Sequence, residues 1–142
     1  MSRPTHGFTI IEVTIVIAVA SVLFAILLPR AWSFVDRIEV RGAVTEIESM
    51  FSLARHVAIA RGRQATLDIE VANRSLSIRA GPDLVERREV GAAHGVSMSS
   101  NRSSITYSPI GVGYGASNFS LIVTRNRAAD TIVVSRLGRV RH

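Results

Sequence analysis

The fold of this chain is decided by residues 7–29, which read GFTIIEVTIVIAVASVLFAILLP. The 21 residues from Phe8 to Leu28 contain a single charge, Glu12. An α-helix needs ~17 to 25 predominantly apolar residues to cross a bilayer, so this run predicts a membrane-spanning helix. A carboxylate at the centre of such a span costs roughly 2.5 to 3.5 kcal/mol, and an ionisable residue there marks a functional site by default.

A cleaved secretory signal is the alternative, because residues 18–20 read Ala-Val-Ala and imitate a small-residue cleavage site. The apolar run continues unbroken past this site to Leu28, and a signal has no use for a carboxylate in its core. Both features favour a membrane span over a cleaved signal.

Beyond Pro29 the helical pattern resumes, with apolar residues at three-, four- and six-residue steps and charged residues on the other faces. The apolar positions are Ile38, Val44, Ile47, Phe51, Ala54 and Ala58. Gly62 is a typical C-terminal stop signal, so one helix is predicted from Phe8 to about Arg61. Pro29 and Gly42 are candidate kinks or points of local melting within it.

From Gln64 onward the hydrophobic period changes to two. Residues 65–71 alternate, Asn73 and Arg74 provide a turn, and residues 76–78 alternate back, which predicts a hairpin. Further strands are predicted at 84–90, 96–99, 104–108, 119–124 and 131–135. The predicted fold class is α+β, with a long N-terminal helix packed on a small antiparallel β-sheet or β-sandwich.

The charge is basic and unevenly distributed. All 17 basic residues are Arg. Residues 8–101 hold ten Arg and ten acids, whereas residues 102–142 hold six Arg and one acid, Asp130. Beyond residue 7, the whole positive excess therefore lies in the last 41 residues.

Composition offers no candidate for catalysis. Cysteine is absent, which excludes a disulfide, a thiolate metal site and a cysteine nucleophile. The four His lack metal-ligand spacing; we expect His56 on the exposed side of the helix and His94 in a loop. The glycine-rich residues 111–115 lack the helix and the Lys-Ser/Thr of a phosphate-binding loop, so a turn is expected there. No enzymatic activity, cofactor or metal site is predicted.

The C-terminal residues 131–142 read TIVVSRLGRVRH. If this tail is extended, Arg139 and Arg141 lie on the same face. The proposed basic stripe comprises Arg136, Gly138 at a turn, Arg139 and Arg141, with Arg125 and Arg127 on the loop between the last two predicted strands. Such a stripe is suited to phosphates. Two alternatives are a solvated edge strand whose charges prevent aggregation, and contact with acidic surfaces of neighbouring subunits.

The N-terminus resembles those of type IV prepilins and the related pseudopilins of type II secretion. The shared features are a short polar leader ending in Gly7, then Phe8 and Glu12, and an apolar helix with a proline, here Pro29. The resemblance implies that a membrane prepilin peptidase cuts after Gly7 and methylates the new amino group of Phe8. It also implies that Glu12 pairs with that amine on a neighbouring pilin or pseudopilin, so that neither charge is buried alone.

The C-terminus resembles a narrower group, which contains the minor pilin FimT and the pseudopilin GspH. The resemblance is carried by Ser-Pro-Ile-Gly at residues 108–111 and by Val-Val-Ser-x-x-Gly-Arg-x-Arg at residues 133–141. In FimT-like proteins the Gly-Arg-x-Arg motif, here Gly138, Arg139 and Arg141, is implicated in binding double-stranded DNA during natural transformation. The first expectation is therefore a DNA-binding minor pilin. The second is a GspH-like pseudopilin with a structural or filament-priming role, and the third is a lone membrane-anchored β domain.

The same resemblance implies the domain organisation and the location. Residues 1–7 are the leader, 8–29 the transmembrane or filament-core half of the helix, 30–62 its amphipathic half, and 63–142 the β-rich domain. The chain is expected to cross the inner membrane once, with a periplasmic C-terminal domain, before it joins a pilus or pseudopilus. Charge counting opposes this orientation, because three Arg follow the span at 30, 37 and 41 and only Arg3 precedes it.

Overall fold

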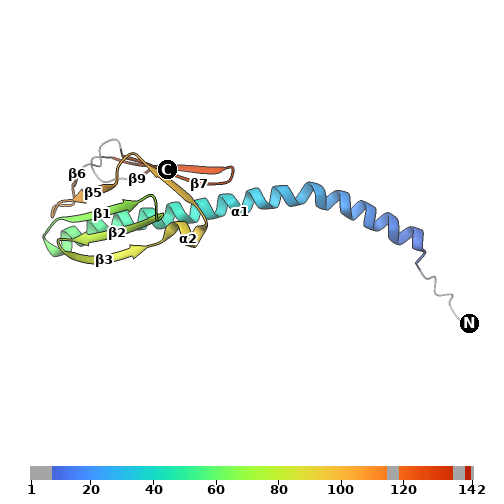
Figure 1. Cartoon of the computed structure of the whole chain (residues 1–142), viewed down its shortest axis with the longest axis horizontal. Helices are drawn as coiled ribbons and strands as arrows, with labels where there is room; N and C mark the ends of the chain where they lie inside the picture. Colours follow the sequence, from blue (N-terminus) through green and yellow to red (C-terminus); the bar gives the residue numbers. More distant parts are fainter. Residues whose placement is uncertain (1–7, 115–118, 136–139, 142) are drawn as a thin grey trace, which may run out of the picture. The chain divides into compact units, whose positions relative to one another are not determined.

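Helix α1 (Ile10–Arg61) begins two residues after its predicted start and ends where the sequence predicted (Figure 1). It is followed by Gly62, which has a left-handed φ of +58°. The amide of Gly62 donates to the carbonyl of Ile59 at 3.2 Å, and the amide of Arg63 donates to the carbonyl of Ala58 at 3.3 Å. This pair of bonds is the Schellman arrangement, which satisfies the last carbonyls of a helix.

The structure is a computed structural model that describes residues 8–114, 119–135 and 140–141, the last two by their backbone alone. The chain divides into two units, Met1–Phe34 and Val35–His142. In the first unit, α1 exposes nearly all of its apolar side chains, and it is long and apolar enough to cross a membrane. The predicted leader, residues 1–7, lies outside the described residues.

Neither Pro29 nor Gly42 interrupts α1, so the expectation of local melting at these positions is wrong. Pro29 costs the helix one backbone hydrogen bond, which the surrounding turns tolerate. At Gly42 a Cβ would lie only 3.0 Å from Cε1 of His94. The glycine therefore leaves room for a ring that packs against the helix.

The second unit contains two antiparallel sheets, which confirms the predicted α+β class. The elements are β1 (Ala65–Glu70), β2 (Ser75–Ala80), β3 (Asp83–Arg88), α2 (Val90–His94), β4 (Ser97–Ser100), β5 (Ser104–Tyr107), β6 (Gly113–Tyr114), β7 (Phe119–Arg125), β8 (Ala128–Val134) and β9 (Val140–Arg141). In one sheet the strand order is β3-β2-β1-β5-β6, and in the other it is β4-β7-β8-β9. The predicted hairpin is β1 and β2, paired from Thr66 opposite Arg79 to Glu70 opposite Ser75.

Short helix α2 is absent from the sequence prediction, which extended a strand to Val90 and placed His94 in a loop. The amide of Gly91 donates to the carbonyl of Arg74 at 2.9 Å, so the chain leaves the sheet at this point. A Cβ at Gly91 would lie 2.1 Å from Cβ of Arg74, so only glycine permits this approach. Gly95, at φ +61°, ends the helix after a little more than one turn.

Strand β8 begins three residues earlier than predicted. Asn126 adopts a left-handed φ of +49°, and Arg125 pairs with Ala128. The expected loop therefore shrinks to a tight turn formed by Asn126 and Arg127. This places Arg125 within β7 and Arg127 at the tip of the turn.

One hydrophobic core joins the second half of α1 to both sheets. Phe51 of α1 meets Phe119 of β7 edge to face, with ring centroids 5.5 Å apart. The predicted apolar face is correct except at Ile38, which is 54% exposed, whereas Val40 and Ala43 are buried. A six-residue step from Val44 turns the helix by about 240°, so Ile38 lies on another face.

Candidate functional site

The predicted assembly site lies at the start of α1. The amide of Thr9 donates to Oε2 of Glu12 at 3.2 Å, and the amide of Glu12 donates to Oγ1 of Thr9 at 3.3 Å. This reciprocal pair is a capping box, in which two amides at a helix start are satisfied by two side chains. The spacing Thr-x-x-Glu predicts it, so the sequence carried a signal that our interpretation of Glu12 did not use.

An apolar hollow surrounds this carboxylate. It has a volume of about 260 Å³ and is lined by Phe8, Glu12, Val13, Val16 and Ile17. Phe8, the residue predicted to be methylated, is 87% exposed, and Gly7 lies outside the described residues. Glu12 forms no ion pair with any residue that the structure describes. Its carboxylate can therefore accept an amine from another molecule.

Arg125, one of the six predicted DNA-binding residues, is engaged within the fold. Its Nε donates to Oδ1 of Asp36 at 3.0 Å, and its Nη1 donates to the carbonyl oxygen of His94. Nδ2 of Asn126 also donates to both Oδ atoms of Asp36, at 3.1 Å each. These contacts tie the turn after β7 to α1 and α2, so the guanidinium of Arg125 is occupied.

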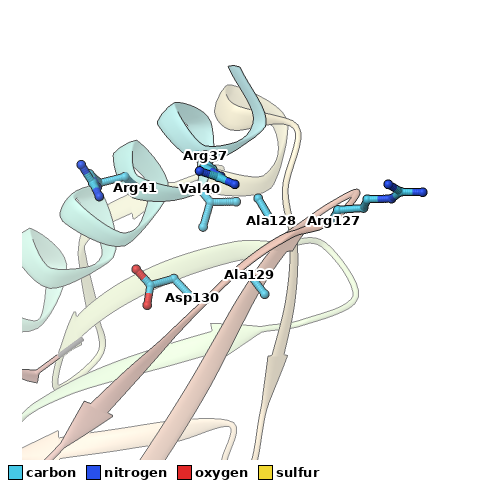
Figure 2. A pocket seen from close by; sticks show the side chains of 7 residues that line it. All are labelled: Arg37, Val40, Arg41, Arg127, Ala128, Ala129 and Asp130. Carbon is cyan, nitrogen blue, oxygen red and sulfur yellow. The ribbon is translucent and has the colours of Figure 1, made fainter. Parts of the chain in front are cut away.

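Arg127 lies two residues further, at the tip of the β7–β8 turn, and is exposed. It borders a pocket of about 260 Å³ together with Arg37 and Arg41 of α1, Val40, and residues 128–130 (Figure 2). Among the described residues, none of these three arginines forms an ion pair. The β7–β8 turn thus brings Arg127, a predicted DNA-binding residue, to the same pocket as Arg37 and Arg41, to which the sequence analysis gave no binding role.

The remaining predicted residues lie at the C-terminus. The backbone of Arg141 belongs to β9, where it pairs with Val133 of β8. Arg136, Gly138 and Arg139 lie outside the described residues. The described part of this segment, Val140 and Arg141, forms β9, which runs along β8 at the end of the sheet order.

The sequence analysis expected His94 in a loop, whereas it lies at the end of α2 beside two glutamates of α1. Its Nδ1 lies 3.0 Å from Oε2 of Glu39, and its Nε2 lies 3.0 Å from Oε2 of Glu46. The ring therefore lies between two glutamates of α1 and is within hydrogen-bond distance of both. The spacing of Glu39, Gly42 and Glu46 on one helix face, with glycine between two acids, is the sequence signal that could have found this site. His56, in contrast, is exposed as predicted.

Two side chains of the second unit have clearly shifted pKa values. A hydrogen bond from Asn73, and then the charge of Arg87, lower the pKa of the exposed Glu70 carboxyl. Burial raises the pKa of Tyr107 to about 12. Within the described residues the Tyr107 hydroxyl also lacks a hydrogen-bond partner. Neither group lies among the predicted site residues.

The part of the chain that the structure describes contains no cluster of three His, Asp or Glu side chains able to hold a metal ion. His94 and its two glutamates are bonded to each other and form a closed group. Several other acids are likewise paired with arginine, including Asp83 with Arg61 and Arg63.

Comparison with known proteins gives two matches to protein families and one recurring structural likeness. Residues 43–138 match the family described as type II transport protein GspH, and residues 2–28 match the prokaryotic N-terminal methylation motif. The sequence has no match among curated proteins.

In structure, the chain is similar to the type IV minor pilin FimU of Pseudomonas aeruginosa. A crystal structure of FimU in space group P21 superposes with a TM-score of 0.64 at 17% identity, over 76% of this chain and 90% of FimU. A second FimU crystal structure, in space group P65, gives a TM-score of 0.59 at 14% identity, over 71% of this chain and 90% of FimU. These likenesses show the same fold.

Proposed function

Because the chain belongs to the GspH family of minor pilins and pseudopilins, we propose that it is a FimT-like minor pilin that binds double-stranded DNA through its C-terminal arginines in natural transformation. The proposed contacts are Arg139 and Arg141 with Gly138, supported by Arg136 and Arg127. The role is one of binding and assembly, without enzymatic activity.

The observation that carries the proposal is the distribution of unneutralised charge. All of the net positive charge beyond residue 7 lies in residues 102–142, which hold six Arg and one acid. Many of the earlier arginines are paired with acids, for example Arg79 with Asp68 at 3.3 Å and Arg87 with Glu70 at 3.5 Å. In the C-terminal part, Arg127 is exposed and forms no ion pair with a described residue. Arginines of this kind are available to the phosphate backbone.

The position of Arg125 changes which residues contribute. Its guanidinium is held by Asp36 and by the carbonyl of His94, so releasing it to a phosphate would cost contacts within the fold. We therefore reduce the proposed phosphate contacts from five arginines to four. At ~0.9 per contact, these four arginines alone contribute about −3.6 to the slope of log affinity against log salt.

The methylation motif implies processing by prepilin peptidase and assembly with other pilins. We propose cleavage between Gly7 and Phe8, methylation of the Phe8 amine, and pairing of that amine with Glu12 of a neighbouring subunit. Before assembly, the apolar half of α1 anchors the chain in the inner membrane, and the second unit faces the periplasm. This arrangement presents the arginines on the outer side of the membrane, where DNA arrives.

A DNA titration tests the proposal. The full-length chain in a non-ionic detergent is titrated with a ~30-base-pair duplex between ~50 and ~200 mM salt, and the slope of log affinity is measured. Arg139→Ala plus Arg141→Ala should reduce affinity and make the slope shallower by ~1.8. Arg61→Ala plus Arg63→Ala removes the same charge at the end of α1 and should leave binding nearly unchanged. Absence of salt-dependent binding, or equal loss in both double variants, would reject the C-terminal motif as the DNA site.

The second candidate function is that of a GspH-like pseudopilin in a type II secretion system, with a structural or filament-priming role. The match of residues 43–138 to the type II transport protein family favours it. It predicts that the chain does not bind DNA, so the same titration separates the two functions.

A further inference from the structure

We propose that Arg37, Arg41 and Arg127 form a second phosphate-binding site, which contacts the DNA backbone beside the C-terminal arginines. The inference rests on the proposed function, since it extends the same DNA contact to α1. Two of the three residues, Arg37 and Arg41, lie outside the basic C-terminal segment. They belong to residues 8–101, whose net charge is zero, so the charge distribution alone does not point to them.

The site brings together two distant parts of the chain. Arg37 and Arg41 are four residues apart on α1 and so lie on one face of the helix. Arg127 reaches the same pocket from the tip of the β7–β8 turn, and the buried Val40 with Ala128 lies between them (Figure 2). The turn is held to α1 by the bonds of Arg125 and Asn126 to Asp36, so the fold fixes the third arginine beside the first two.

The guanidinium groups at this site are available to a ligand. Arg37, Arg41 and Arg127 are exposed and form no ion pair with any described residue. The acids nearest along α1 are already occupied, because Asp36 is bound to Arg125 and Glu39 lies 3.0 Å from His94. Asp130 is the one acid lining the pocket, and its Oδ1 accepts the amide of Thr131 at 2.7 Å. The pocket is therefore lined by three positive charges and one negative charge.

The arrangement suits a phosphodiester backbone better than a single small anion. The three guanidinium groups point in different directions around the pocket, as Figure 2 shows, so they do not chelate one atom group. Spaced, diverging arginines match the repeated phosphates of a nucleic-acid strand. A single carboxylate from a neighbouring protein would engage one of them and leave the others unpaired.

The pocket and the backbone of Arg141 lie at opposite ends of β8. Arg127 precedes the first residue of β8, and Arg141 pairs with Val133 near its last residue. At ~3.4 Å per residue, the five steps from Ala128 to Val133 span ~17 Å. This equals the rise of about five base pairs, so one duplex can contact both ends of β8.

Three variants of the full-length chain in non-ionic detergent test the site, with the same duplex titration as readout. Arg37→Gln plus Arg41→Gln removes both charges and keeps a polar side chain at each position. It should make the salt slope shallower by ~1.8, whereas the control Arg61→Gln plus Arg63→Gln should not. Arg37→Lys plus Arg41→Lys should restore most of the slope.

Asp130→Asn removes the acid from the pocket and should therefore raise DNA affinity. Misfolding would lower the affinity, so it cannot account for such a gain. The inference is overturned if Arg37→Gln plus Arg41→Gln keeps the wild-type salt slope while Arg139→Ala plus Arg141→Ala makes the slope shallower. That result leaves the proposed function intact. If no variant and no wild-type chain binds DNA, the proposed function fails. Capture of an acidic neighbouring subunit through Arg37 and Arg41, with DNA binding unchanged, would assign the pocket to assembly and also overturn the inference.

Discussion

At the scale of single residues, Glu12 is satisfied before any assembly occurs. Its carboxylate accepts the amide of Thr9 at 3.2 Å and thereby closes the start of α1. An unpaired carboxylate in an apolar helix is costly, and this capping bond reduces the cost in the separate subunit. The proposed pairing with the Phe8 amine of a neighbour would replace this neutral donor by a cationic one, which forms a stronger bond.

His94 supports a prediction about stability. His94→Ala leaves Glu39 and Glu46 without their shared donor and opens space beside Gly42. We expect the free energy of unfolding to fall by about 1–3 kcal/mol, the usual cost of an unsatisfied, partly buried polar group. Urea denaturation of residues 35–142, followed by circular dichroism, measures this loss. His56→Ala, on the exposed side of α1, is the control and should change stability little; equal effects would contradict the prediction.

Tyr107 predicts a pH dependence. Burial raises its pKa from 10.0 to about 12, so the folded state holds the phenol proton more tightly than the unfolded state. Its contribution to stability is complete below pH 10 and is lost as the pH rises from about 10 to about 12. Tyr107→Phe should flatten this alkaline loss in denaturation curves. At neutral pH it should not destabilise the protein, because within the described residues the hydroxyl has no partner to lose.

At the scale of elements, α2 exists because a glycine allows it to approach β2. Gly91→Ala would place a Cβ 2.1 Å from Cβ of Arg74, a backbone-fixed atom that cannot swing aside. We expect a loss of about 2 to 3 kcal/mol in the free energy of unfolding. Thermal or urea denaturation measures it. Ala92→Gly, in the exposed part of the same short helix, serves as the comparison, and a larger effect there would show that helix propensity rather than contact governs α2.

The elements also show where pattern recognition succeeds. The period of two in residues 65–71 predicts β1, and the apolar period in α1 predicts a face that packs on the sheets. Both patterns are local, because each follows from the repeat of one element. The tight turn at Asn126 and the start of β8 were missed, since a left-handed φ at asparagine is permitted by sequence without being required.

At the scale of the whole molecule, cleavage of the leader after Gly7 is the first test of the assignment as a prepilin. Gly7→Leu should block the proposed cleavage, because the peptidase needs an unobstructed backbone at the cut. The chain should then keep its leader and lack a methylated Phe8, as mass spectrometry of the membrane fraction would reveal. Glu12→Gln is the matched control: it should be cleaved normally, since the change lies beyond the cut. A mature N-terminus on the Gly7 variant would contradict the assignment.

The sequence by itself determined the membrane-length helix, its end at Gly62, the β-rich second part and the membership of the pilin-like group. The helix, its end and the strands follow from composition and period, which act over a few neighbouring residues, whereas the group membership follows from the resemblance of the motifs at the two ends of the chain. The tertiary structure alone decided that Arg125 is bound to Asp36, 89 residues away, while Arg127 stays exposed beside Arg37 and Arg41. It also decided that His94 lies between Glu39 and Glu46. Such pairings depend on how the sheets close on α1, and no local pattern encodes which of two similar arginines the fold will use.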